Sequence, residues 1–128
     1  MTETPDNVFF LGLGGMGMAP LALYLNEAGC RVRGCDDHWR EPVRRLLERQ
    51  GIAASPCGEL PADTARVVYS SAVAPEHPIM RAARERGLGT LRRGEMLAEA
   101  VRGRRLIAVV GSHGKTTTTA LLIHALRA

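Results

Sequence analysis

The stretch 107–119, which reads IAVVGSHGKTTTT, is the feature that most constrains the fold of this chain. Its first four residues are all apolar, as is typical of a strand covered on both faces of a parallel sheet. Gly111 and Gly114 allow the backbone to curl so that several amide N–H groups point inward. Lys115 adds a mobile cation, and Thr116 adds a hydroxyl that can hold Mg²⁺. Strand, glycine turn and helix, in that order, predict a phosphate-binding loop at a helix N-terminus.

The lysine of this stretch has no counterpart elsewhere in the chain. Lys115 is the only lysine among 17 basic residues, and all the others are arginines. A compact ammonium group suits a nucleotide phosphate. Val109 stands where the general P-loop pattern has a glycine, so the loop is the shorter variant Gly-x-x-Gly-Lys-Thr. The alternative interpretation is an ordinary glycine-rich turn between a strand and a helix.

A second glycine-rich turn lies near the N-terminus, between a predicted strand at 7–13 and a predicted helix at 16–28. The turn spans residues 12–17 and has the pattern Gly-x-Gly-x-x-Gly. A predicted strand at 31–35 follows and ends at Asp36. This order is the fingerprint of a dinucleotide-type fold, in which the turn holds a phosphate and the acid binds a ribose. The pattern does not identify the nucleotide, and Asp36 is alternatively a solvated carboxylate at a strand end.

The rest of the sequence alternates between helical and strand patterns. Helices are predicted at 41–50, 78–86, 93–101 and 115–128, and strands at 52–54, 66–69 and 88–91. This alternation predicts an α/β fold. We expect a Rossmann-like parallel sheet flanked by helices, followed by the opening strand–P-loop–helix of a second, ATPase domain.

Two serines follow the predicted strand at 66–69. Ser70, Ser71 and Ala72 therefore lie at the carboxyl end of a parallel strand, where ligands bind in open α/β sheets. A serine-capped turn explains the same residues, because serine hydroxyls satisfy loose backbone groups. Both interpretations stay open at this point.

The two glycine loops divide the chain into a domain at 1–103 and the start of another at 104–128. No neighbouring strand and no second acidic Mg²⁺ site follow the second loop, so we expect the second domain to be incomplete. Residues from Leu106 onward should be poorly supported in a monomer. They would be mobile, packed against the first domain, or paired with another copy through the unpaired strand 106–110.

Composition and charge exclude several classes of protein. No apolar run approaches the ~20 residues of a membrane helix, and the polar start 1–7 lacks the apolar core of a signal peptide. We therefore expect a cytoplasmic protein without a membrane partner. The net charge of +4 permits nucleic-acid binding. The few aromatic residues are not interleaved with basic ones, so no nucleic-acid surface is expected, and an acidic small molecule explains the charge equally well.

The cysteines and histidines give little sign of metal or redox chemistry. Cys30, Cys35 and Cys57 show no metal-ligand spacing, and an odd count argues against a disulfide framework. We expect reduced thiols that mostly pack. His113 lies inside the predicted phosphate loop, where it either contacts the nucleotide and shapes the loop or serves as a spacer that tolerates the turn. The other histidines have no partners that the sequence reveals, and no metal or general-base role is assigned to them.

Four segments together resemble the Mur ligases, and the resemblance covers essentially the whole chain. These segments are 11–18 (LGLGGMGM), 69–73 (YSSAV), 92–98 (RRGEMLA) and 107–119. The similarity is strongest to the members that join L-alanine to UDP-N-acetylmuramate. Gly94 stands where alanine is common in that family, and His77 stands where asparagine is common.

The resemblance implies a domain order and a reaction. An N-terminal Rossmann-like domain would hold UDP-N-acetylmuramate, and a central ATPase domain and a C-terminal amino-acid domain would follow. In the family reaction the substrate carboxylate attacks the γ-phosphate of ATP to give an acyl phosphate, and the amine of L-alanine then displaces phosphate. The L-alanine site would lie outside this chain, which would bind the UDP-sugar but not catalyse alone.

The resemblance also implies roles for individual residues. The ATP-binding residues would be Gly111, Ser112, His113, Gly114, Lys115, Thr116 and Thr117. Among them, Lys115 would act in catalysis by neutralising charge on the transferring phosphoryl group, and Thr116 would ligate Mg²⁺. The residues that bind the UDP-sugar would be Gly14, Gly15, Met16, Gly17, Asp36, Ser70, Ser71 and Ala72.

Three other functions stay open on the sequence. A murein peptide ligase of the same family attaches a tripeptide to the same UDP-sugar. A nicotinamide-dependent oxidoreductase domain would use the first glycine loop and Asp36. A small non-catalytic nucleotide-binding module would need neither ATP nor Lys115.

Overall fold

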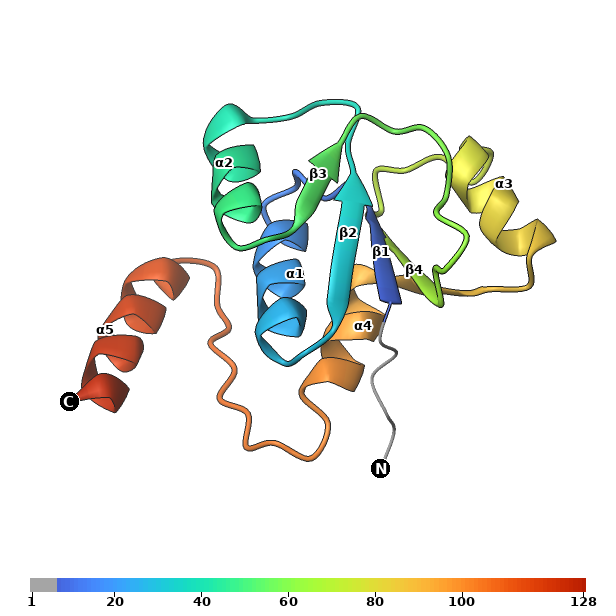
Figure 1. Cartoon of the computed structure of the whole chain (residues 1–128). Helices are drawn as coiled ribbons and strands as arrows, with labels where there is room; N and C mark the ends of the chain where they lie inside the picture. The colour runs from blue at the N-terminus through green and yellow to red at the C-terminus, as the bar shows by residue number, and fades with distance from the viewer. Residues whose placement is uncertain (1–6) are drawn as a thin grey trace.

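The computed structural model describes residues 7–128, so the polar start of the chain lies almost wholly outside it (Figure 1). The strands are β1 (Asn7–Leu11), β2 (Arg31–Cys35), β3 (Ala53–Ser55), β4 (Arg66–Tyr69) and β5 (Gly89–Arg92). The helices are α1 (Met18–Glu27), α2 (Glu41–Arg49), α3 (Pro78–Glu85), α4 (Arg93–Ala100) and α5 (Lys115–Arg127). None of these helices is long and apolar enough to cross a membrane.

The five strands form one parallel sheet in the order β3-β2-β1-β4-β5. Strand β1 lies in the middle of the sheet, and β2 and β3 follow on one side of it. The chain then crosses over β1, so that β4 and β5 lie on the other side. The direction of winding reverses between β1 and β4, which is the switch point where open α/β sheets bind ligands. The predicted Rossmann-like sheet is confirmed, and each of its predicted elements forms within two residues of its expected ends.

The alternating side chains of β1 divide the core into two layers. Phe10 faces α1, α2 and α4, where it packs with Leu25, Leu47 and Met96. Phe9 faces the opposite side, where α3 contributes Ile79, Met80 and Ala83. The stripe expected on α1 is confirmed, since Met18, Leu21, Ala22 and Leu25 are all buried.

Several apolar residues expected in the core are exposed. Leu46 of α2 and Leu97 of α4 are each more than two-fifths exposed. Their chain neighbours Leu47 and Met96 face the sheet instead and are buried. On α5, Leu121 and Leu126 are about two-thirds exposed. No residue of α5 is buried, so its apolar side chains have no surface of the first domain to pack against.

The strand predicted at 107–110 is wrong for this structure. These residues form neither helix nor strand, and Val110 is 86% exposed. A lone β-strand has no stability without a neighbour to accept its backbone hydrogen bonds, and no described strand lies beside it. The self-association predicted through residues 106–110 therefore has no preformed strand to use. Figure 1 shows the segment as a long open connection leading to α5.

The expectation of three reduced cysteines is also wrong. Cys35 and Cys57 form a disulfide whose Cα atoms lie 4.9 Å apart. The segment after β3 folds back over the end of β2, and an ion pair between Arg33 and Asp63 fixes its far end at 2.5 Å. The hydrogen bond from Arg33 holds the pKa of Asp63 below its ordinary value. Counting cysteines could not reveal this pair, because the contact depends on the course of the loop.

Gly34 of β2 makes the closest approach in the sheet. A methyl group at this position would lie 2.5 Å from the Phe10 carbonyl oxygen and 2.7 Å from Leu13 Cδ2. We predict that Gly34→Ala lowers the free energy of unfolding by about 1–3 kcal/mol, because the backbone of β1 must shift to admit it. Urea denaturation measures this change. Gly58→Ala is the matched control, since no atom lies within 4 Å of its added carbon, and equal stability loss in both variants would contradict the prediction.

Candidate functional site

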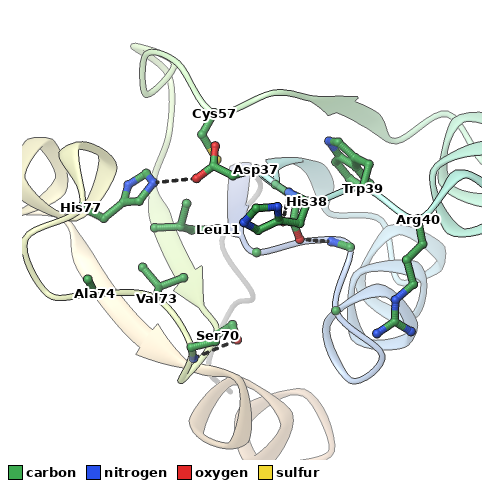
Figure 2. Close-up of a pocket in the computed structure, with 15 residues that line it drawn as sticks. Leu11, Asp37, His38, Trp39, Arg40, Cys57, Ser70, Val73, Ala74 and His77 are labelled. Carbon is green, nitrogen blue, oxygen red and sulfur yellow. Dashed lines mark hydrogen bonds and ion pairs between the residues drawn. The ribbon is translucent and has the colours of Figure 1, made fainter.

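Two adjoining pockets open at the carboxyl ends of the strands, beside the switch point. The larger pocket has a volume of about 660 Å³ and is drawn in Figure 2. It is lined by Leu11, Gly12, Gly14, Gly15, Asp36, Asp37, His38, Trp39, Arg40, Cys57, Ser70, Ala72, Val73, Ala74 and His77. The smaller pocket, of about 500 Å³, is lined by Gly15, Met16, Gly17, Met18, Ser70, Ser71, Arg92, Arg93, Gly94 and Glu95. Gly15 and Ser70 line both, so the two pockets meet.

All eight residues predicted to bind a UDP-sugar line these pockets. They come from the glycine turn after β1, the end of β2 and the loop after β4. Parallel strands bring their carboxyl ends to one edge of the sheet, so loops far apart in the sequence converge there. Binding by these residues remains a prediction, but the structure places them in one continuous area.

Asp36 organises the glycine turn. Its Oδ2 accepts a hydrogen bond of 2.8 Å from the backbone N–H of Gly14, and its Oδ1 accepts one of 2.8 Å from the N–H of His38. The carboxylate is thus neither a purely solvated group nor a free ribose acceptor. It holds the turn after β1 against the loop after β2, and each oxygen keeps lone-pair capacity for a ligand hydroxyl.

Ser70 fits both interpretations of the serines after β4, because it caps a turn and also lines the pockets. Its hydroxyl accepts a 3.2 Å hydrogen bond from the N–H of Ala72, which makes it the cap of its own turn. It also lines both pockets. The turn therefore fixes Ser70 at the junction of the pockets, where its hydroxyl proton stays available as a donor.

Positive groups converge on the smaller pocket. The backbone N–H groups of Met16 and Gly17 donate to no acceptor within residues 7–128, and the first turn of α1 carries no acidic residue. Arg93 lies against this helix start, because a methyl group at Gly17 would be 2.9 Å from its Nε. A hydrogen bond to Tyr69 raises the pKa of Arg92, whose guanidinium lines the same pocket. A guanidinium beside a helix N-terminus is an unfavourable pairing that a bound anion would relieve.

Sequence reasoning missed the two arginines and several residues of the larger pocket. Arg92 and Arg93 stand in the segment that carried the family resemblance, but their position opposite the glycine turn depends on the pairing of β5 with β4. Trp39 donates its indole N–H to the Ser55 carbonyl at 3.1 Å, which fixes the loop after β2 to the end of β3. His77 caps α3 by accepting from the N–H of Ile79 at 3.1 Å. No spacing in the sequence signals these contacts.

The second glycine loop lies apart from these pockets. Gly114 takes a left-handed conformation with φ of 77° and precedes the first residue of α5. Lys115 Nζ donates to the Gly111 carbonyl at 2.6 Å and closes the loop on itself. None of the residues 111–117 lines either pocket. The structure therefore separates the predicted ATP-binding residues from the predicted UDP-sugar residues.

The strand order and the pockets at the switch point define an α/β domain of the Rossmann-like class. The family model described as "Mur ligase family, catalytic domain" matches residues 7–105. The chain belongs to the Mur ligase family.

Relatives with known names agree with this family. The UDP-N-acetylmuramate–L-alanine ligase of Sinorhizobium fredii is 42% identical over 123 residues, which cover 95% of this chain and 26% of that protein. The ligase of the same name from a Chelativorans species is 44% identical over 124 residues, with the same coverage of each. The chain thus spans about a quarter of the length of these relatives.

Solved structures show the same architecture. The UDP-N-acetylmuramate-alanine ligase of Thermotoga maritima superposes with a TM-score of 0.86 at 28% identity, covering 94% of this chain and 29% of that one. A murein peptide ligase of Psychrobacter arcticus superposes with a TM-score of 0.85 at 31% identity, covering 95% of this chain and 26% of that one.

The two hydrogen bonds of Asp36 predict a structural cost for its removal. We expect Asp36→Ala to lower the free energy of unfolding by about 1–3 kcal/mol, because the buried Gly14 N–H loses its acceptor. Chemical denaturation measures the loss. Asp37→Ala is the control, since that carboxylate accepts no backbone hydrogen bond within the described residues. Similar stability of the two variants would show that Asp36 does not hold the turn.

Proposed function

We propose that this chain is the UDP-sugar-binding part of a ligase that uses ATP to join L-alanine to UDP-N-acetylmuramate in the synthesis of peptidoglycan precursors. The relatives that bear this name support the activity. The observation that carries the proposal for this chain is that one pocket is lined by Arg92, Arg93 and the residues Met16 and Gly17, whose N–H groups are free within the part of the chain that the structure describes. We expect the protein to work in the cytoplasm.

The two pockets suit different parts of a UDP-sugar. The diphosphate would lie in the smaller pocket, where the N-terminus of α1 and Arg93 supply donors and positive charge. The uridine would lie toward the larger pocket, where Asp36 and Ser70 can hydrogen-bond to hydroxyl groups. This arrangement gives each predicted residue a part of the UDP-sugar to bind. It also gives Arg93, which was not among the predicted site residues, a role in binding the diphosphate.

The loop before α5 fits a triphosphate and Mg²⁺. It offers the ammonium of Lys115, the hydroxyl of Thr116 and a left-handed turn at Gly114 that leads into the first residue of α5. Gly111, Ser112, His113 and Thr117 complete the loop, and their exposure leaves their polar groups accessible. Lys115 would exchange its contact with the Gly111 carbonyl for a phosphate oxygen. Bound Mg²⁺ would neutralise phosphate charge.

A murein peptide ligase is the second proposed function, because the Psychrobacter arcticus enzyme superposes over 95% of this chain. The Neisseria relative named for the L-alanyl-γ-D-glutamyl-meso-diaminopimelate peptide also superposes, with a TM-score of 0.83. Both functions use the same UDP-sugar. The choice between L-alanine and a peptide acceptor lies outside the two pockets, so the binding experiments below apply equally to both.

Calorimetric titration of the 128-residue chain tests the assignment of the diphosphate. We predict that Arg93→Ala weakens UDP-N-acetylmuramate binding by roughly 10- to 100-fold, as expected for the loss of a charge-assisted hydrogen bond. Uridine, which lacks phosphates, should bind both proteins equally. Arg102→Ala, an exposed arginine at the end of α4, is the matched control. Tighter binding of NAD(H) than of the UDP-sugar would instead support an oxidoreductase domain.

The two glycine-rich loops lie apart, and this separation predicts that the chain alone does not turn over substrate. We expect no phosphate release above background from ATP, Mg²⁺, UDP-N-acetylmuramate and L-alanine with the 128-residue chain, because Lys115 and Thr116 line neither pocket. A malachite-green assay measures phosphate release. Substrate-dependent release that Lys115→Ala abolishes would contradict this expectation.

A further inference from the structure

Three potential metal ligands of different chemistry meet in the larger pocket. Asp37 follows β2, Cys57 follows β3, and His77 precedes α3, so each comes from a separate segment. One ligand atom from each lies within 4.8 Å of those from the other two. The carboxylate and imidazole already form a pair, with His77 Nε2 3.5 Å from Asp37 Oδ2. Figure 2 shows the three side chains converging on one side of the pocket.

We propose that the reduced form of this chain binds a divalent Zn²⁺-type cation through Asp37, Cys57 and His77. Oxygen, sulfur and nitrogen atoms of these side-chain types are common ligands of Zn²⁺. Where Zn²⁺ also contacts water or a bound molecule, it takes three protein ligands and keeps the fourth position open. Zinc–ligand bonds of about 2.0–2.3 Å place tetrahedral ligand atoms roughly 3.3–3.8 Å apart. The three side chains are incompletely buried, so small rotations can bring their ligand atoms from within 4.8 Å of one another to this tetrahedral spacing.

The disulfide controls whether Cys57 is available. A dithiol reductant would attack the Cys57 sulfur, which lines the pocket, rather than Cys35, which is 1% exposed. Cys35 leaves as a thiolate and takes a proton, and the second thiol of the reductant closes its own disulfide and releases Cys57. Two electrons and two protons thus pass from the dithiol to the protein. Zn²⁺ then replaces the Cys57 thiol proton, which goes to solvent.

His77 must change its hydrogen bonding to take part. Its Nδ1 accepts from the Ile79 N–H, so the ring proton of the neutral imidazole sits on Nε2. Metal binding through Nε2 moves that proton to Nδ1 and ends the cap on α3. The lost cap lowers the stability of α3, and the metal–ligand bonds must outweigh this loss. The site is therefore expected to bind zinc less tightly than a preformed structural site.

The test uses the whole 128-residue chain with metal alone, so its outcome does not depend on the proposed UDP-sugar function. The chain is reduced with dithiothreitol, desalted without oxygen and titrated with Co²⁺ and Zn²⁺, beside an oxidised sample. We expect one equivalent of Zn²⁺ per reduced chain and none per oxidised chain, by elemental analysis after desalting. Co²⁺ should give a sulfur-to-metal charge-transfer band only in the reduced sample. Equal metal content in both samples would overturn the proposal.

Variants assign the ligands. Cys57→Ser should abolish the charge-transfer band, and His77→Asn should weaken zinc binding at least about tenfold while asparagine keeps the cap of α3. His38→Asn is the matched control, because His38 lines the same pocket but lies outside the cluster. Retention of the band in Cys57→Ser would assign the metal to another cysteine and refute the site. Unchanged zinc affinity in His77→Asn would refute it as well.

Discussion

The parallel pairing of β1 with both β2 and β4 is the constraint on which the rest of this structure depends. It places residues 7–11 in the middle of the sheet and sends their side chains alternately into two core layers. It also forces the chain to reverse its direction of winding beside β1. The glycine turn and the loop after β4 then face each other across that point, and the pockets form between them.

The electrostatics of the site follow from this geometry. Met16 and Gly17, whose N–H groups just before α1 are free within residues 7–128, line the same pocket as Arg92 at the end of β5 and Arg93 at the start of α4. An ion pair of 2.5 Å between Arg66 and Glu99 ties the C-terminal end of α4 to β4, at the end of the helix opposite to Arg93. Positive charge on the smaller pocket is therefore built from elements that the core already fixes. Carboxylates line both pockets, with Asp36 and Asp37 on the larger one and Glu95 on the smaller one.

Much of the fold could be read from the sequence, because its signals are local. Apolar residues marked β1 and β4, and glycines and an acid at fixed spacing marked the turn after β1. The role of Asp36 could not be read, since the pattern predicts an acid at this place but not the bond that it accepts from Gly14. The contacts of Arg93 and Cys57 depend on the course of loops and on strand order, which no local pattern encodes.

The strand predicted at 107–110 failed for a different reason. Its apolar residues carry a correct local signal for a buried strand, but a strand needs a neighbour, and none is present among the described residues. The same holds for Leu121 and Leu126, whose helix forms while their side chains stay in water. Local sequence sets the preference of a segment, and its surroundings decide whether the preference is met.

One carboxylate links two walls of the larger pocket. Because Asp36 accepts from the amides of both Gly14 and His38, the glycine turn and the loop after β2 share one anchor. Any rotation of this carboxylate would therefore move both segments together. The shape of the pocket and a polar group that it offers to a ligand thus reside in the same side chain.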